Sequence, residues 1–180
     1  IRDTSVTGVQ TCALPICVLL MRSYALSGNS AHYDAVIESL ELRGMRVIPA
    51  FASGLDARPA VKAFFMDRGE PIVDAVVSLT GFSLVGGPAY NDTDAAQEML
   101  AALDVPYLAV QGLEFQSLQD WESSSMGLMP VEATMMVAIP ELDGATGSMV
   151  FGGRSELSAG EKFDRSEEHT SELQSPMYLV

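Results

Sequence analysis

Residues 73–79 read Val73-Asp74-Ala75-Val76-Val77-Ser78-Leu79, and they carry the strongest strand signal in the chain. Apart from Asp74, the run consists of apolar and small side chains, without the polar alternation of a half-exposed strand. Such a run is typical of a strand that is buried on both faces of a parallel sheet. A glycine-rich loop over residues 80–91 and then a helix signal follow it, so the stretch predicts a strand, a loop and a helix in succession.

The same succession of strand and helix recurs on both sides of this stretch. Further strands are expected at residues 18–21, 47–51, 107–110 and 149–151. Apolar residues at helical spacing predict helices from a cap at 29 or 30 to Gly44, and over 58–68, 92–103, 117–121 and 130–138. The sequence therefore predicts an α/β fold, a doubly wound parallel sheet of four to five strands with helices on both faces. Pro49 lacks a backbone donor, which favours an edge position for its strand.

Ligands of such sheets bind at the carboxyl ends of the strands, near the point where the strand order reverses. The loops at that edge are expected at residues 23–30, 52–58, 80–91 and 111–116. The loop 80–91 lacks the G-x-G-x-x-G spacing and the lysine that phosphate-binding loops carry. Two interpretations remain open for it. One is an irregular loop that needs glycine dihedral angles, which the chemistry favours slightly, and the other is a flat apolar wall for a ring-shaped ligand.

Few residues outside that loop suggest chemistry. Glu114 lies at the expected ligand edge and could act as a base or a metal contact, although such a residue is more often solvated or ion-paired. His32 has no second His or Cys with which to form a zinc site, and we expect it at the surface or as a helix cap. Pro140-Glu141-Leu142-Asp143-Gly144 is expected to be a turn whose two carboxylates give a weak signal for a hard cation. No catalytic set can be assembled from these residues.

The charge of the chain excludes several classes of partner. It has 24 acidic and 10 basic residues, a net charge of −14, and no cluster of Lys or Arg. Nucleic-acid binding depends on neutralising phosphates, so we expect no nucleic-acid partner. Anionic membrane surfaces are disfavoured for the same reason, and no apolar run approaches the roughly 20 residues of a membrane span.

The two flanks of the chain carry an unusual relation at the level of codons. One permitted spelling of residues 8–16 is, apart from its outermost bases, the reverse complement of one spelling of residues 165–173. This relation is typical of one sequencing adapter at both ends of a DNA insert. We therefore expect residues 1–17 and 165–180 to be translated adapter, with a single α/β module at 18–164. Residues 1–16 and 166–180 should then pack poorly, and Cys12 and Cys17 should form no metal or redox pair.

Five segments carry a resemblance to a known family. They are residues 76–89, residues 103–107, Glu114-Phe115-Gln116, residues 137–144 and Val150-Phe151-Gly152-Gly153-Arg154. They closely resemble the H subunit of magnesium chelatase, in the large-subunit family that also contains cobaltochelatase. The resemblance spans residues 18–164, and the Gly86-Gly87-Pro88-Ala89 loop and residues 129–136 look more like the bacteriochlorophyll branch.

The resemblance implies a cytoplasmic enzyme subunit, a ligase that forms metal–nitrogen bonds. Such a subunit binds protoporphyrin IX and is the site of Mg²⁺ insertion in (bacterio)chlorophyll biosynthesis, with ATP hydrolysed by AAA+ partner subunits. The family's His/Glu-containing catalytic motif is expected beyond Asp164, so the isolated fragment should be inactive and its metal ligands stay unassigned. The candidate substrate contacts are Thr80, Gly81, Phe82, Gly86, Gly87, Tyr90, Glu114 and Gln116.

Three other functions stay open at this point. The first is the cobaltochelatase large subunit of cobalamin biosynthesis, the nearest relative within the family. The second is a non-enzymatic α/β module that binds a small molecule. The third is an interaction domain that scaffolds the ATPase partners.

Overall fold

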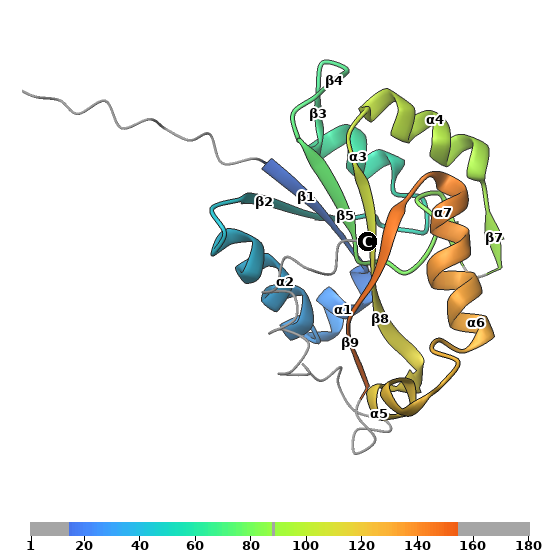
Figure 1. Ribbon diagram of the computed structural model, residues 1–180. Helices are drawn as coiled ribbons and strands as arrows, with labels where there is room; N and C mark the ends of the chain where they lie inside the picture. The colour runs from blue at the N-terminus through green and yellow to red at the C-terminus, as the bar shows by residue number, and fades with distance from the viewer. Residues whose placement is uncertain (1–14, 88, 155–180) are drawn as a thin grey trace, which may run out of the picture.

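A computed structural model describes residues 15–87 and 89–154. Its main sheet has the strand order β2-β1-β5-β8-β9, and every neighbouring pair is parallel (Figure 1). The strands are β1 (Pro15–Leu20), β2 (Arg46–Phe51), β5 (Ala75–Ser78), β8 (Tyr107–Ser117) and β9 (Thr146–Arg154). The expectation of a parallel α/β sheet is confirmed, and Pro49 lies on the edge strand β2. The chain passes from β1 to β2 on one side of the sheet, and from β5 to β8 on the other side. The strand order therefore reverses between the neighbours β1 and β5.

Helices cover both faces of this sheet. On one face α1 (Arg22–Ser27) and α2 (Ala31–Glu41) follow β1, and Tyr33 of α2 packs into the core there. On the other face lie α3 (Arg58–Phe64) and α4 (Thr93–Leu103) (Figure 1). They bury Val61 and Leu103 there. Asp92 caps α4 by accepting a hydrogen bond from the amide of Ala95 at 3.1 Å, at the start of the helix that the sequence predicted over 92–103.

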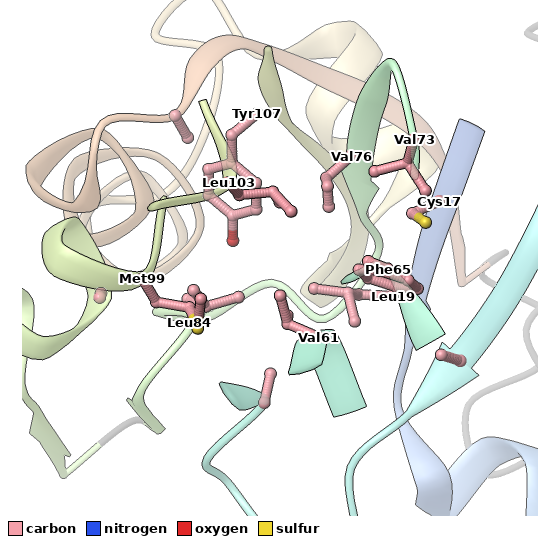
Figure 2. Packing of buried hydrophobic residues seen from close by; sticks show 14 of the residues in the cluster. Cys17, Leu19, Val61, Phe65, Val73, Val76, Leu84, Met99, Leu103 and Tyr107 are labelled. Carbon is pink, nitrogen blue, oxygen red and sulfur yellow. The ribbon is translucent and has the colours of Figure 1, made fainter. Parts of the chain in front are cut away.

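The central strand β1 shows why the buried strands read as continuous apolar runs. Its side chains alternate, so that Ile16 and Val18 face α2. Cys17 and Leu19 point the other way, into the larger core that Figure 2 shows beside Phe65. Both faces are covered, and a polar residue at any of these positions would be buried.

The start of β1 differs from the expectation. The strand begins at Pro15, three residues before the predicted start, and both Ile16 and Cys17 are buried. The expectation that residues 15 and 16 pack poorly is therefore wrong. Both residues pair in register with β2, and Ile16 also pairs with β5. An apolar side chain is sufficient at this position. Burial raises the pKa of the Cys17 thiol to about 12, which leaves it protonated and inert. Cys12 and the rest of the flanks lie outside the described residues.

Three connections also differ from the sequence expectations. The loop expected at 23–30 contains α1. The helix expected to reach residue 68 ends at Phe64, and a hairpin of β3 (Met66–Asp67) and β4 (Glu70–Pro71) follows. The loop expected at 111–116 belongs to β8, which continues to Ser117 before α5 (Leu118–Ser123) begins.

The last helical segment is longer than the sequence indicated. It consists of α6 (Pro130–Glu132), the π-helical stretch η1 (Ala133–Ala138) and α7 (Ile139–Asp143), one after another. The expected turn at residues 140–144 is wrong, because Pro140 lies in the first turn of α7, where a proline is tolerated, and Gly144 with φ +110° ends the helix. Within the part of the chain that the structure describes, no helix combines the length and apolar character needed to cross a bilayer.

Candidate functional site

The carboxyl ends of β1, β5 and β8 bring most of the candidate residues to one edge of the sheet. Thr80 and Gly81 come two and three residues after the end of β5, and Glu114 lies in the last part of β8. The Thr80 hydroxyl lies 3.0 Å from the hydroxyl of Ser78, which fixes the start of the loop. This edge contains the point where the strand order reverses, where open α/β sheets bind ligands.

Two small hollows open on either side of Thr80. The α3-side hollow, about 40 Å³ in volume, is lined by Met21, Leu55, Thr80, Phe82 and Gly86 among others. The α2-side hollow, about 10 Å³, is lined by Tyr24, His32, Thr80, Gly81, Glu114 and Met136 among others. The larger has room for a few water molecules and the smaller for about one. Thr80 is the candidate residue that the two hollows share.

The candidate loop 80–91 folds into a short hairpin, and its glycines have steric reasons to be there. Strands β6 (Gly86–Gly87) and β7 (Tyr90–Asn91) pair antiparallel. Gly86 has φ +135°, and a Cβ at this position would lie 2.3 Å from the carbonyl oxygen of Tyr90. The interpretation of an irregular loop that needs glycine is therefore confirmed at Gly86. The interpretation as an apolar wall stays a prediction, with the Tyr90 ring 68% exposed beside this hairpin.

Glu114 is held on two sides. The hydroxyl of Tyr24 donates a hydrogen bond of 2.6 Å to Oε1 of Glu114. The backbone amide of Glu114 donates to Oε1 of Glu132 at 3.1 Å, across 18 residues of sequence. Burial and the neighbouring Glu114 carboxylate both raise the pKa of the Tyr24 phenol above its ordinary value, which keeps that phenol a hydrogen-bond donor. Gln116, the other candidate on β8, is buried and lines neither hollow.

His32 lies inside the protein, and the expectation of a surface or capping position is wrong. Its side chain is 5% exposed, at the start of α2. Its ring centroid lies 4.0 Å from that of Tyr33 and 5.2 Å from that of Tyr24, and it stacks on Phe151 at 6.0 Å. Burial lowers the pKa of His32 to about 4, partly opposed by the charge of Asp34. The imidazole is therefore neutral at physiological pH and forms one wall of the α2-side hollow.

The two carboxylates of residues 140–144 do not form a cation site together. Asp143 is buried, and its Oδ2 accepts a hydrogen bond of 2.8 Å from the backbone amide of Leu84, whereas Glu141 is exposed. Burial raises the pKa of Asp143, opposed by hydrogen bonds from Leu84 and Ser83. Among residues 15–87 and 89–154, no three His, Cys, Asp or Glu side chains are grouped to hold a metal ion. Asp143 instead ties the end of α7 to the candidate loop.

The sequence did not indicate the roles of three residues at this edge, which are Tyr24, the buried His32 and Glu132. Tyr24 lies in α1, which was expected to be a loop. Glu132 has a fully buried side chain, yet in the sequence it resembles any acidic residue in the first turn of a helix. The one available signal was its position within residues 129–136, a run that resembles the family.

The sequence of this chain is similar to known proteins over most of its length. Residues 6–176 match the family model described as CobN/Magnesium Chelatase. The H subunit of magnesium chelatase from Cereibacter sphaeroides is 60% identical over 141 residues, which cover 78% of this chain and 12% of that protein. The corresponding protein from Rhodobacter capsulatus is 57% identical over 139 residues, which cover 77% of this chain and 11% of that protein. The chain thus spans only a small part of the length of these relatives.

A solved structure shares the fold. The catalytic subunit of cobaltochelatase from Mycobacterium tuberculosis matches with a TM-score of 0.69 and 28% sequence identity. The match covers 92% of this chain and 14% of that protein. The α/β arrangement described above is therefore also found as one part of a much larger protein.

Proposed function

The chain belongs to the CobN/magnesium chelatase family, and we propose that it is an internal segment of a porphyrin-binding H subunit of magnesium chelatase. The proposed activity of the whole subunit is the ATP-dependent, cytoplasmic insertion of Mg²⁺ into protoporphyrin IX, a ligase reaction of (bacterio)chlorophyll biosynthesis. The observation that carries this proposal is the 60% identity to an H subunit over 141 residues, against 28% with the cobaltochelatase structure.

We propose that the carboxyl edge of the sheet supplies one wall of the tetrapyrrole site. The two hollows measure about 40 and 10 Å³, whereas pockets for drug-sized ligands measure roughly 300–1,000 Å³. The carboxyl edge is therefore too shallow to enclose a macrocycle by itself, and the other walls come from further parts of the subunit. The wall consists of the candidate contacts Thr80, Gly81, Phe82, Gly86, Gly87, Tyr90 and Glu114, with Gln116 behind it.

The chemistry of the reaction explains what this segment leaves to other parts. Insertion requires distortion of the macrocycle, loss of two pyrrole protons and removal of water from Mg²⁺. Mg²⁺ gives up its water reluctantly, which accounts for the proposed coupling to ATP hydrolysis by AAA+ partner subunits. The described residues group no acidic or histidine ligands for Mg²⁺, which is a substrate here. We accordingly assign no catalytic residue to this segment and expect the isolated chain to form no Mg-porphyrin.

A pair of exposed aromatic residues tests the proposed wall in the full-length H subunit. Tyr90→Ala removes a ring from the carboxyl edge, and Phe64→Ala removes one that is 54% exposed at the end of α3. Quenching of protein fluorescence by protoporphyrin IX gives the Kd of each variant. We expect Tyr90→Ala to raise the Kd about three- to tenfold, the range of one lost aromatic contact, and Phe64→Ala to leave it unchanged. Equal affinities of the two variants for protoporphyrin IX would contradict the proposal that this edge contacts the tetrapyrrole.

A cobaltochelatase large subunit is the second candidate, because a catalytic subunit of that enzyme shares the fold with a TM-score of 0.69. The full-length protein with its ATPase partners separates the two. Mg²⁺ and protoporphyrin IX should give a metallated product, and Co²⁺ with a corrin precursor should not. The reverse selectivity would favour the second candidate.

We also propose that residues 1–17 and 165–180 are translated adapter around the module at 18–164. The codon relation between residues 8–16 and 165–173 supports this, whereas the packing of Ile16 in β1 requires only an apolar residue. The genomic DNA around this coding segment tests it. Family-like sequence should replace both flanks, and an unchanged genomic flank would refute the proposal.

A further inference from the structure

The side chain of Glu132 makes an unusual set of contacts. Its carboxylate is 0% exposed, at the end of α6. Oε1 accepts three backbone hydrogen bonds, from Glu114 at 3.1 Å, Phe115 at 2.9 Å and Gln116 at 3.3 Å. A buried carboxylate is costly unless hydrogen bonds compensate its lost hydration. The three amide donors provide this compensation at Oε1, whereas the buried Oε2 has no hydrogen-bond partner among the described residues. The conformation of β8 at these residues is thus tied to one side chain of α6.

Three consecutive amides cannot point the same way in a regular strand, because successive peptide groups alternate. The pairing of β8 with β9 is indeed irregular here, with a register shift between Leu113 and Ser117. Irregularities of this kind redirect side chains. At this one, Glu114 reaches the Tyr24 hydroxyl at 2.6 Å, while the neighbouring Phe115 ring is 54% exposed.

We propose that Glu132 is a positioning residue, which fixes the direction of Glu114 so that Glu114 offers a carboxylate oxygen to an N–H donor of the bound tetrapyrrole. This inference rests on the proposed function. The Tyr24 hydroxyl holds Oε1 of Glu114, so Oε2 is the atom for the ligand. Glu114 is half-buried on the α2-side hollow next to Gly81, at the same edge as the exposed Tyr90. Glu132 is itself buried and acts only through the backbone of β8.

A double-mutant cycle in the full-length H subunit tests this coupling. Glu114→Gln is expected to weaken protoporphyrin IX binding about tenfold, a loss typical of one charge-assisted hydrogen bond. Glu132→Leu keeps the volume but removes the acceptor, and it should weaken binding to a similar degree. The double variant should bind no more weakly than either single variant, because both changes remove the same contact. Effects that multiply would overturn the proposal.

Two conservative variants show whether weaker binding by Glu132→Leu comes from a folding defect. Glu132→Gln keeps an oxygen acceptor and should bind protoporphyrin IX within about twofold of the wild-type protein. Glu132→Asp keeps the charge but is shorter, and it should show an intermediate loss. Val131→Ala, at an exposed neighbouring position, is the matched control and should change nothing. A Glu132→Gln variant as weak as Glu132→Leu would contradict the proposal.

Amide hydrogen exchange of the same variants without tetrapyrrole separates the two proposals. Glu132→Leu should accelerate exchange at Glu114, Phe115 and Gln116, because their amides lose their acceptor. Unchanged exchange would refute the role of Glu132 even if the proposed function holds. Faster exchange combined with wild-type binding by Glu114→Gln would instead refute the contact between Glu114 and the tetrapyrrole.

Discussion

The candidate wall consists of two segments that are shaped in different ways. The loop 80–91 is shaped partly by its own residues, with Gly86 at φ +135° in a hairpin where its neighbours leave no room for a Cβ. The end of β8 is shaped from outside, by a carboxylate that lies 16 to 18 residues away along the chain. The loop also has long-range hydrogen bonds, between its backbone and that of Leu55 and Ala57 and from the Leu84 amide to Asp143. A local constraint of this kind can be read from sequence, whereas a long-range one depends on the assembled fold.

The largest effect is expected when the outside constraint on β8 is removed. Glu132→Leu leaves three amides without their acceptor, one of them buried and two part-buried, which should lower the free energy of unfolding of the chain by about 3 kcal/mol. Urea unfolding measures this value. A loss below about 1 kcal/mol would show that β8 holds its shape without Glu132.

The local constraint on the loop should give the next largest effect. Gly86→Ala places a Cβ 2.3 Å from the Tyr90 carbonyl oxygen at a strained φ, which should cost about 2–3 kcal/mol of unfolding free energy. Gly54→Ala is the matched control, because nothing lies within 4 Å of a Cβ there. Equal stability of the two variants in urea would contradict the hairpin geometry.

Asp143 should matter less, and its effect should depend on which replacement is made. Asp143→Ala leaves the Leu84 amide unpaired, which should cost about 1–2 kcal/mol of unfolding free energy. Asp143→Asn keeps an acceptor and should be at least as stable as the wild-type chain at pH 7.

The expected stability of Asp143→Asn at pH 7 follows from the raised pKa of Asp143. The stabilisation from a carboxyl with a raised pKa is fully present below its ordinary pKa and is lost as the pH rises through the folded-state value. Asp143→Asn should remove that loss. An Asp143→Asn chain less stable than wild type at pH 7 would show that the charge itself stabilises the loop.

His32, which lines the α2-side hollow together with residues of both segments, should give the smallest effect at pH 7 and a visible one in acid. Burial lowers its pKa to about 4, so between its ordinary pKa of 6.5 and this value the unfolded chain binds the proton more strongly than the folded chain. Stability should therefore fall as the pH drops through this window. His32→Phe should reduce that fall, measured as the difference in unfolding free energy between pH 7 and pH 5. An imidazole that titrates near its ordinary pKa in the folded chain would contradict its burial.

The same contrast explains what the sequence predicted and what it did not. The strand within residues 73–79 and the helix over 92–103 follow from local patterns, and the structure confirms them as β5 and α4. Residues 111–116 contain Gly and polar side chains and resemble a loop, yet pairing with β9 and the Glu132 carboxylate keep them in β8. His32 packs against Tyr24, Tyr33 and Phe151, and because Phe151 lies far away in the sequence, local patterns do not reveal the whole environment of the ring. The candidate contacts themselves stay predictions.

We propose that the carboxyl edge of this module faces the tetrapyrrole in the full-length H subunit. Hydrogen exchange with and without protoporphyrin IX tests this placement. Binding should slow exchange in residues 80–91 and 111–117 and leave residues 104–107, at the opposite edge of the sheet, unchanged. Protection confined to residues 104–107, or absent from both segments of the carboxyl edge, would contradict the claim.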